Sequence, residues 1–116
     1  MIGQDIAEQV SLIGPTWYAN IWVAGDHHKA VELCREFCGH TPLRVTVTPT
    51  TYVCTGGAEE GVCVRSIQYP RFPEDEESRT NKVIDLAEFL RSRLCQHSYC
   101  VEFQDETVWD GASETP

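Results

Sequence analysis

The stretch TPTTYVCTGGAEEGVCVRSIQYPRFP, residues 48–73, holds two strand-like runs around a glycine-rich segment. The glycines of GGAEEG (56–61) permit positive φ, so this segment is predicted to be a turn with Glu59 and Glu60 in solvent. The prolines of YPRFP (69–73) restrict the backbone to extended geometry, so the chain is expected to leave the sheet there. The stretch therefore predicts a β-hairpin, and it leaves open whether the hairpin also presents a ligand site.

The residues before the hairpin predict a strand, a helix and a second strand. In TWYANIWVA (16–24), apolar residues alternate with Tyr18, Asn20 and Trp22, which is typical of a half-buried strand. Asp26 is a good N-cap for the amphipathic run HHKAVELCREFC that follows. LRVTVT (43–48) alternates again and leads into the first arm of the hairpin.

A second helix and a last strand follow the hairpin. The helix is expected to begin at the acidic cluster 74–77 and to end near Cys95, with acids at its start and arginines near its end as the macrodipole favours. HSYCVEFQ (97–104) predicts the last strand, and TVW (107–109) is expected to extend it after a bulge or a turn. The order βαββαβ predicts an α+β, ferredoxin-like fold: a four-stranded antiparallel sheet with two helices on one face and the first and third strands central.

The ends of the chain are predicted to lie outside this domain. Apolar residues at helical spacing in QDIAEQVSLI (4–13) predict a short N-terminal helix before Gly14-Pro15. We therefore expect an N-terminal helical segment over 1–15, a single domain over 16–109 and a flexible acidic tail over 110–116.

Composition excludes several classes of function. Eighteen acids against nine bases give a formal net charge of −9, which disfavours direct binding of nucleic acid. No apolar run approaches the roughly 20 residues of a spanning helix, and the start lacks signal-peptide character, so a cytoplasmic protein without membrane contact is expected. The six cysteines show no CxxC pair, and we interpret them as reduced, small buried hydrophobes. No metal or other cofactor is predicted.

The sheet face opposite the helices is predicted to be a contact surface. It carries aromatic, arginine and small polar side chains, and packing of two such faces in a homo-oligomer is the favoured interpretation. A platform for a small ligand is the alternative. The predicted face consists of Tyr18, Asn20, Trp22, Arg44, Thr46, Thr48, Cys63, Arg65, Ile67, Cys100, Glu102 and Gln104.

YPRFP is the strongest candidate for a ligand site. Its rings offer stacking faces, its arginine offers a planar fork for phosphate or carboxylate, and its prolines limit the entropy lost on binding. The favoured interpretation is nevertheless a stapled loop whose aromatic rings pack over the second helix and in which Arg71 pairs with the acidic cluster 74–77. For a small anionic ligand, the predicted binding residues are Arg71, Tyr69, Phe72, Arg65, Arg44, Trp22 and Tyr18.

Catalytic and metal motifs are weak. His27 and His28 at a helix start point in different directions, so they are interpreted as solvated residues rather than metal ligands. Cys95 with His97 is the one local pair of nucleophile and base. Without a G-x-S-x-G, H-E-x-x-H or Walker pattern, no catalytic residue is assigned and the chain is expected not to be an enzyme.

The segments VTPTTYVCTGG, GVCVRSIQYPRFP, QHSYC and TVW, taken in this order, resemble small accessory proteins encoded by bacteriophages. The resemblance spans residues 17–109 and carries over no functional residue. It implies counter-defence in an infected or lysogenic host, by blocking a defence complex or by sequestering a nucleotide signal.

Three functions remain open. The first is a non-catalytic protein that sequesters a small nucleotide-type ligand. The second is an acidic inhibitor that docks on the basic surface of a host defence protein. The third is a small enzyme that uses Cys95 and His97 or an arginine-lined pocket. The acids that would carry the second function are Glu59, Glu60, Glu74, Asp75, Glu76 and Glu77.

Overall fold

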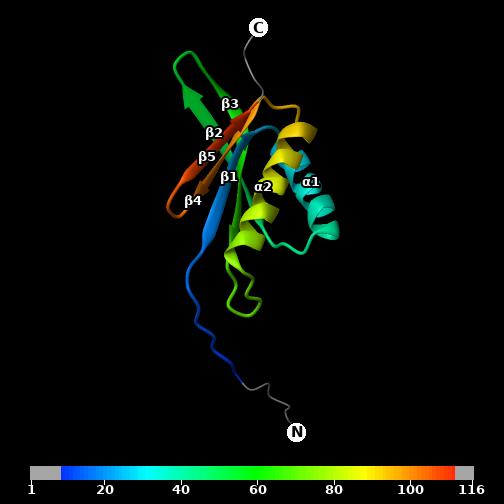
Figure 1. The fold of residues 1–116 in the computed structure, drawn as a ribbon. Helices are drawn as coiled ribbons and strands as arrows, with labels where there is room; N and C mark the ends of the chain where they lie inside the picture. The colour runs from blue at the N-terminus through cyan, green and yellow to red at the C-terminus, as the bar shows by residue number, and fades with distance from the viewer. Residues whose placement is uncertain (1–8, 112–116) are drawn as a thin grey trace.

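The computed structural model describes residues 9–111. Two helices and five strands follow one another along these residues. They are β1 (Tyr18–Ala24), α1 (His27–His40), β2 (Thr46–Cys54), β3 (Gly57–Ile67), α2 (Glu76–Arg93), β4 (Ser98–Phe103) and β5 (Thr107–Gly111). Both helices lie on one face of the sheet, and the opposite face is open (Figure 1).

The sheet has the order β2-β3-β1-β4-β5, with every neighbouring pair antiparallel. The first four strands confirm the ferredoxin-like arrangement, with β1 and β3 inside. The predicted number of four strands is wrong, because the segment TVWDG turns back and pairs with β4 as a fifth strand. The Phe103 backbone N–H donates to the Glu106 carbonyl at 2.8 Å and closes the turn. Asp110 and Gly111 therefore belong to the sheet, and residues 112–116 of the predicted tail lie outside the described residues.

The hairpin turns earlier than predicted. Cys54 pairs with Gly57, so only Thr55 and Gly56 form the loop, and Gly56 has a φ of 92°. A two-residue loop needs positive φ, which glycine adopts at little cost. Glu59 and Glu60 consequently lie within β3, opposite Tyr52 and Thr51, so the prediction that they belong to the turn is wrong. Both are exposed to solvent, as predicted.

Two helix predictions also change. Residues 9–13 form no helix, and the exposed fraction of Ile13 is 97%, so this segment has no surface on which to bury an apolar stripe. The rest of the predicted helix lies outside the described residues. The second helix begins at Glu76 rather than Glu74, because the Asp75 carboxylate accepts from the Ser78 backbone N–H at 3.2 Å and acts as the N-cap.

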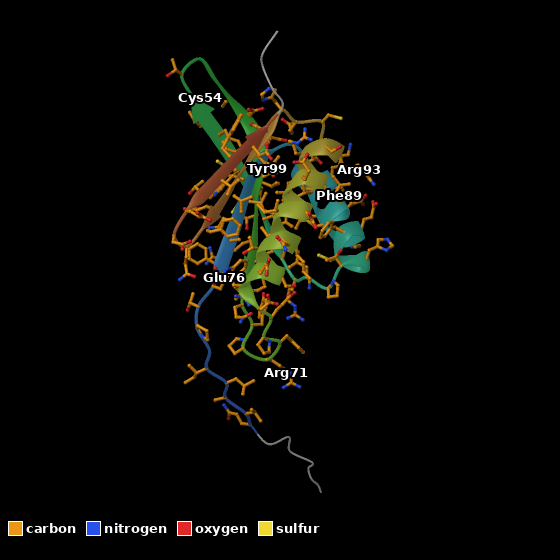
Figure 2. The ribbon with its side chains drawn as sticks, in the orientation of Figure 1. Cys54, Arg71, Glu76, Phe89, Arg93 and Tyr99 are labelled. Atoms are coloured by element: carbon orange, nitrogen blue, oxygen red, sulfur yellow. The ribbon has the colours of Figure 1, made fainter. Side chains whose placement is uncertain are left out.

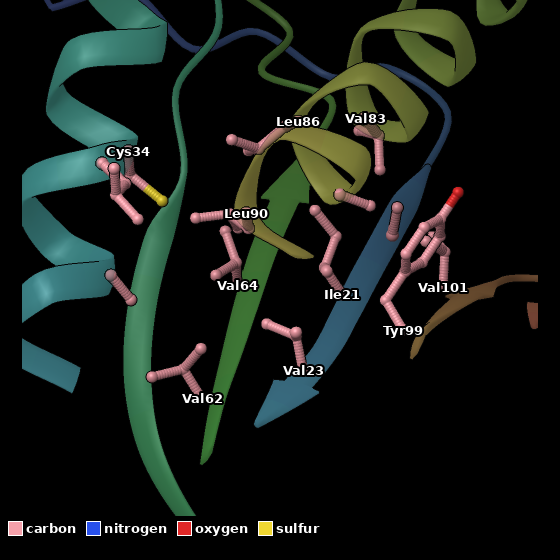
Figure 3. Close-up of a cluster of buried hydrophobic side chains, with 14 of the residues drawn as sticks. Ile21, Val23, Cys34, Val62, Val64, Val83, Leu86, Leu90, Tyr99 and Val101 are labelled. Carbon is pink, nitrogen blue, oxygen red and sulfur yellow. The ribbon is translucent and has the colours of Figure 1, made fainter. Parts of the chain in front are cut away.

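The core lies between the helices and the covered face of the sheet (Figure 3). Ala19, Ile21 and Val23 of β1 point into it and are at most 1% exposed. Strand alternation therefore places Tyr18, Asn20 and Trp22 on the open face, as predicted. The six cysteines are free, but only Cys34 is buried, while Cys54 and Cys95 are exposed, so their common interpretation as buried hydrophobes is wrong.

Candidate functional site

A polar network crosses the open face at the middle of the sheet. The pairing register places Arg65, Asn20 and Glu102 side by side on β3, β1 and β4. Arg65 Nη1 donates to Asn20 Oδ1 at 2.9 Å, and Asn20 Nδ2 donates to Glu102 Oε1 at 3.2 Å. A positive and a negative neighbour therefore fix the orientation of the buried Asn20 amide. The network holds one cation and one carboxylate at defined positions on an otherwise uncovered surface.

Aromatic side chains border this network. Trp22 Nε1 donates to the same oxygen, Glu102 Oε1, at 3.1 Å. The Arg65 guanidinium lies 4.8 Å from the centre of the Tyr18 ring, a cation–π distance. Trp109 of β5 pairs across from Cys100 and is 61% exposed, so the unpredicted fifth strand adds an aromatic group to the open face.

A hollow of about 250 Å³ lies beside the network, and we call it the open-face hollow. Residues of all five strands line it, which is possible because side chains of one parity on each strand share this face. Strands β1 to β5 contribute Trp22, Val23, Ala24, Tyr52, Glu59, Ser98, Tyr99, Cys100 and Trp109 to its lining. The combination of aromatic rings with a carboxylate suits a planar, positively charged ligand.

Gly61 allows Tyr52 to reach this hollow. A Cβ atom at Gly61 would lie 2.3 Å from Tyr52 Cε2 and 2.9 Å from the Val23 carbonyl oxygen. Only glycine leaves room for the tyrosine ring over the strand at this point. Burial, together with Cys100, Cys63 and Glu59, raises the pKa of Tyr52 to about 12. Its hydroxyl is therefore a hydrogen-bond donor at neutral pH, not a base.

The predicted ligand residues fall into two groups. Tyr18, Trp22 and Arg65 lie on the open face, whereas Arg44, Tyr69 and Phe72 line a separate cavity of about 580 Å³ below the YPRFP loop. We call this second space the loop cavity. Figure 2 shows Arg71 at the loop end of the molecule and Cys54 at the other end.

Contacts of the loop residues differ from the expected ion pair. The Arg44 guanidinium lies 5.1 Å from the centre of the Tyr69 ring, and that of Arg71 lies 5.8 Å from the centre of the Phe72 ring. Among the ion pairs of residues 9–111, none joins Arg71 to the acidic cluster 74–77. Glu74 instead contacts Lys82 and Ser78, and these contacts lower its pKa.

The acids predicted for a partner surface do not form one row. Glu59 faces the open-face hollow, while Glu60 lies beside Asp26 and His27 at a different hollow. Asp75 caps α2, and Glu76 borders a third cavity near Asp105. Glu77 lies in the first turn of α2. These acids therefore lie at separate places on the molecule and do not form one continuous acidic surface.

Four residues of these sites were missed as candidates: Tyr52, Glu102 as a network centre, Trp109 and Arg79. Alternation along the strand places Tyr52 and Trp109 on the open face, and this is the signal by which the sequence could have identified them.

Cys95 is exposed, and neither it nor His97 lines the open-face hollow. No group of three His, Cys, Asp or Glu residues within 9–111 gathers as metal ligands would. The helices in that range are too short or too polar to cross a membrane.

Comparison by sequence finds no matching family model and no matching curated protein. Comparison by structure finds two solved phage proteins. A phage SAM lyase in complex with S-methyl-5'-thioadenosine matches with a TM-score of 0.78 at 18% identity, over 95% of this chain and 100% of that one. This chain shares its fold with a phage SAM lyase. A second match, to a phage SAM lyase in the apo state, has a TM-score of 0.70 at 21% identity, over 94% of this chain and 100% of that one.

These matches correct the expected function. The chain was predicted to be a non-catalytic protein that sequesters a ligand, and the acidic inhibitor was the first alternative. Both matched structures are of enzymes, and one holds a small nucleoside ligand. The prediction of a non-catalytic protein is therefore wrong, and the alternative of a small enzyme on a ferredoxin-like fold fits the matches better. Both neighbours are phage proteins, in keeping with the resemblance drawn from sequence.

Proposed function

We propose that this chain is a lyase for S-adenosylmethionine (SAM) that releases S-methyl-5'-thioadenosine. The observation that carries the proposal is the match to a phage SAM lyase over 95% of this chain and the whole of the other. A likeness at 18% identity establishes the fold, so the assignment of the reaction rests on the site as well.

The lining of the open-face hollow suits groups of this substrate, although its volume of about 250 Å³ is below the roughly 300 to 1,000 Å³ of typical ligand pockets and holds only part of the molecule. SAM joins an adenine ring, a sulfonium cation and an amino-acid group. Trp22, Tyr52 and Trp109 offer ring faces for stacking on adenine and for cation–π contact with the sulfonium. The Glu59 carboxylate at the edge of the hollow attracts the same positive charge. In this assignment Arg65, which belongs to the polar network and does not line the hollow, is the cation on the same face that meets the substrate carboxylate.

The reaction breaks the bond between the sulfonium sulfur and Cγ of the amino-acid group. The electron pair goes to sulfur, which leaves as the neutral thioether S-methyl-5'-thioadenosine. A lyase adds no water, so Cγ is either attacked by the substrate's own carboxylate, giving a lactone, or joined to Cβ by a double bond as the Cβ proton passes to solvent water. Positive charge disappears as the bond breaks, so a site sheltered from water and a fixed substrate conformation both favour it.

Product analysis tests the proposal. The purified protein is incubated with SAM in water enriched in ¹⁸O, and products are followed by mass spectrometry against a heat-inactivated sample. We expect S-methyl-5'-thioadenosine together with a lactone or an unsaturated amino acid that carries no ¹⁸O when first formed. Absence of S-methyl-5'-thioadenosine above the inactivated sample would remove the proposed activity. Direct formation of labelled homoserine would make the protein a hydrolase instead.

We also propose that the open face joins copies of the chain, as the sequence analysis favoured. Trp109 and Ile67 on this face are 61% and 37% exposed, and apolar groups of this size are costly to leave in water. Light scattering after size exclusion should give a mass that is a multiple of 13.1 kDa. A mass of one chain at micromolar concentration would contradict this arrangement.

Counter-defence is the setting that we propose for the activity. Both matched lyases are phage proteins, and SAM is the methyl donor of host methyltransferases. A lyase would deprive such enzymes of their common substrate without contacting any of them. Expression of the chain in bacteria should therefore lower the cellular SAM pool, and an unchanged pool would contradict this setting.

A further inference from the structure

Arg79 of α2 is a buried charge with few partners. Its side chain lies beneath the loop at the end of the molecule away from the hairpin tip, and the residue is only 8% exposed. Nη1 donates to Gln68 Oε1 at 2.8 Å, and the guanidinium lies 4.7 Å from the centre of the Trp17 ring. Nε is buried and donates to no acceptor within residues 9–111. Removing a guanidinium from water is costly unless its charge and donors are satisfied.

In the described part of the chain, Arg79 has no carboxylate in direct contact. Arg79 takes part in none of the ion pairs formed within residues 9–111. The nearest acid that lines the loop cavity is Glu74, which already contacts the Lys82 ammonium and the Ser78 hydroxyl. Gln68 is neutral, and the Trp17 ring satisfies no N–H group by hydrogen bonding. Carboxylates therefore lie near Arg79, but none within residues 9–111 forms a direct ion pair with it.

Arg79 borders two cavities of opposite character. A cavity of about 480 Å³ also contains Glu76, Asp105 and Glu106, whose charges exclude an anion. The loop cavity, of about 580 Å³, contains Arg44 as a second cation without an ion pair. Because ligand sites are typically about 300 to 1,000 Å³, the loop cavity is large enough for a small organic molecule. It shares no lining residue with the open-face hollow.

We propose that the loop cavity binds a small oxyanion, phosphate or carboxylate, carried on a planar ring. Arg79 and Arg44 supply planar forks that match either oxyanion. Tyr69 and Phe72 line the same cavity, and Phe72 is 64% exposed, so its ring face is accessible for stacking. The site is separate from the hollow assigned to SAM, and it stands whether or not the lyase activity does.

Titration calorimetry with simple probes tests the proposal without using a nucleoside. Phenyl phosphate, benzoate, inorganic phosphate and phenol are each titrated into the full chain at fixed low salt. We expect phenyl phosphate or benzoate to bind more tightly than inorganic phosphate and than phenol, because only the first two carry both ring and oxyanion. The tighter-binding probe of these two shows whether the site prefers a phosphate or a carboxylate. Failure of both to bind at millimolar concentration would overturn the proposal.

Variants locate the binding. Arg79→Gln should weaken the tighter probe at least about tenfold, since it removes charge-assisted hydrogen bonds. Arg93→Gln is the matched control, because Arg93 lies on the same helix but is half-exposed and pairs with Glu36, and it should change affinity less than twofold. Circular dichroism checks the fold. If Arg79→Gln does not fold, the exposed Arg44→Gln decides, and unchanged affinity in whichever variant folds would overturn the proposal.

Discussion

The two faces of β1 differ in the side chains they carry: one face is apolar and buried in the core, and the other is polar and open. On the covered face, Ala19, Ile21 and Val23 are sealed in the core, where only size and apolarity matter. On the open face, Asn20 and Trp22 bind a charged network and border a hollow. The fold survives at 18 to 21% identity to the phage lyases, because many apolar sequences fill the same core. Under the proposed function, the chemistry resides in the particular residues of the open face.

Deleting core volume should have the largest effect on stability. Leu90 of α2 is fully buried between the helices and the sheet, so Leu90→Ala should lower the free energy of unfolding by about 2 to 5 kcal/mol. Val53→Ala on the exposed hairpin should change it by less than about 0.5 kcal/mol. Urea unfolding followed by circular dichroism measures both, and equal losses would break the contrast between covered and exposed positions.

A methyl group on the open face should affect both stability and activity. Gly61→Ala places its Cβ against the Tyr52 ring and the Val23 carbonyl, so unfolding should become easier by about 1 to 3 kcal/mol and the rate of SAM cleavage should fall. Gly57→Ala meets no atom within 4 Å and serves as the control. A Gly61→Ala variant as stable and as active as Gly57→Ala would show that Tyr52 does not need its position over the strand.

The smallest effect is confined to alkaline pH. Burial raises the pKa values of Tyr52 and Tyr99 from 10.0 to about 12 in the folded chain. Between these values the unfolded chain loses protons that the folded chain keeps, so stability falls as pH rises from 10 toward 12. Tyr52→Phe should reduce this fall and leave the melting temperature at pH 7 to 9 little changed. A slope between pH 9 and 11 identical to that of the unaltered chain would contradict the raised pKa.

Most of the fold follows from local patterns. The alternation of 17–23, the Asp26 cap and the paired arms around the glycines each specify an element by short-range physics. The fifth strand escaped prediction because TVWDG is short and partly polar, and its pairing with β4 determines its structure more than its own propensity does. The hairpin turn shifted because any of three glycines could occupy it, and cross-strand pairing of Tyr52 with Glu59 favours the tighter loop.

The sequence predicts which residues face the site but not the contacts between them. Period-two alternation identifies which side chains face outward, and it placed Tyr18, Trp22 and Arg65 together. It does not show that Asn20 and Glu102, which are 82 residues apart, share a hydrogen bond. Nor does it show that Arg79, one of several charged residues in α2, is buried. Both facts depend on tertiary packing, which no local period encodes.

The most direct test of the account compares adjacent glutamates on opposite faces of β3. Glu59 lines the open-face hollow and Glu60 does not, so the two share residue type, strand and exposure but differ in face. We predict that Glu59→Gln lowers kcat/KM for S-methyl-5'-thioadenosine release from SAM by about tenfold or more, because it removes a charge that attracts the cationic substrate to the hollow. Glu60→Gln should leave kcat/KM within about twofold. Equal kcat/KM for the two variants, or a larger loss in Glu60→Gln, would contradict the assignment of the chemistry to the open face.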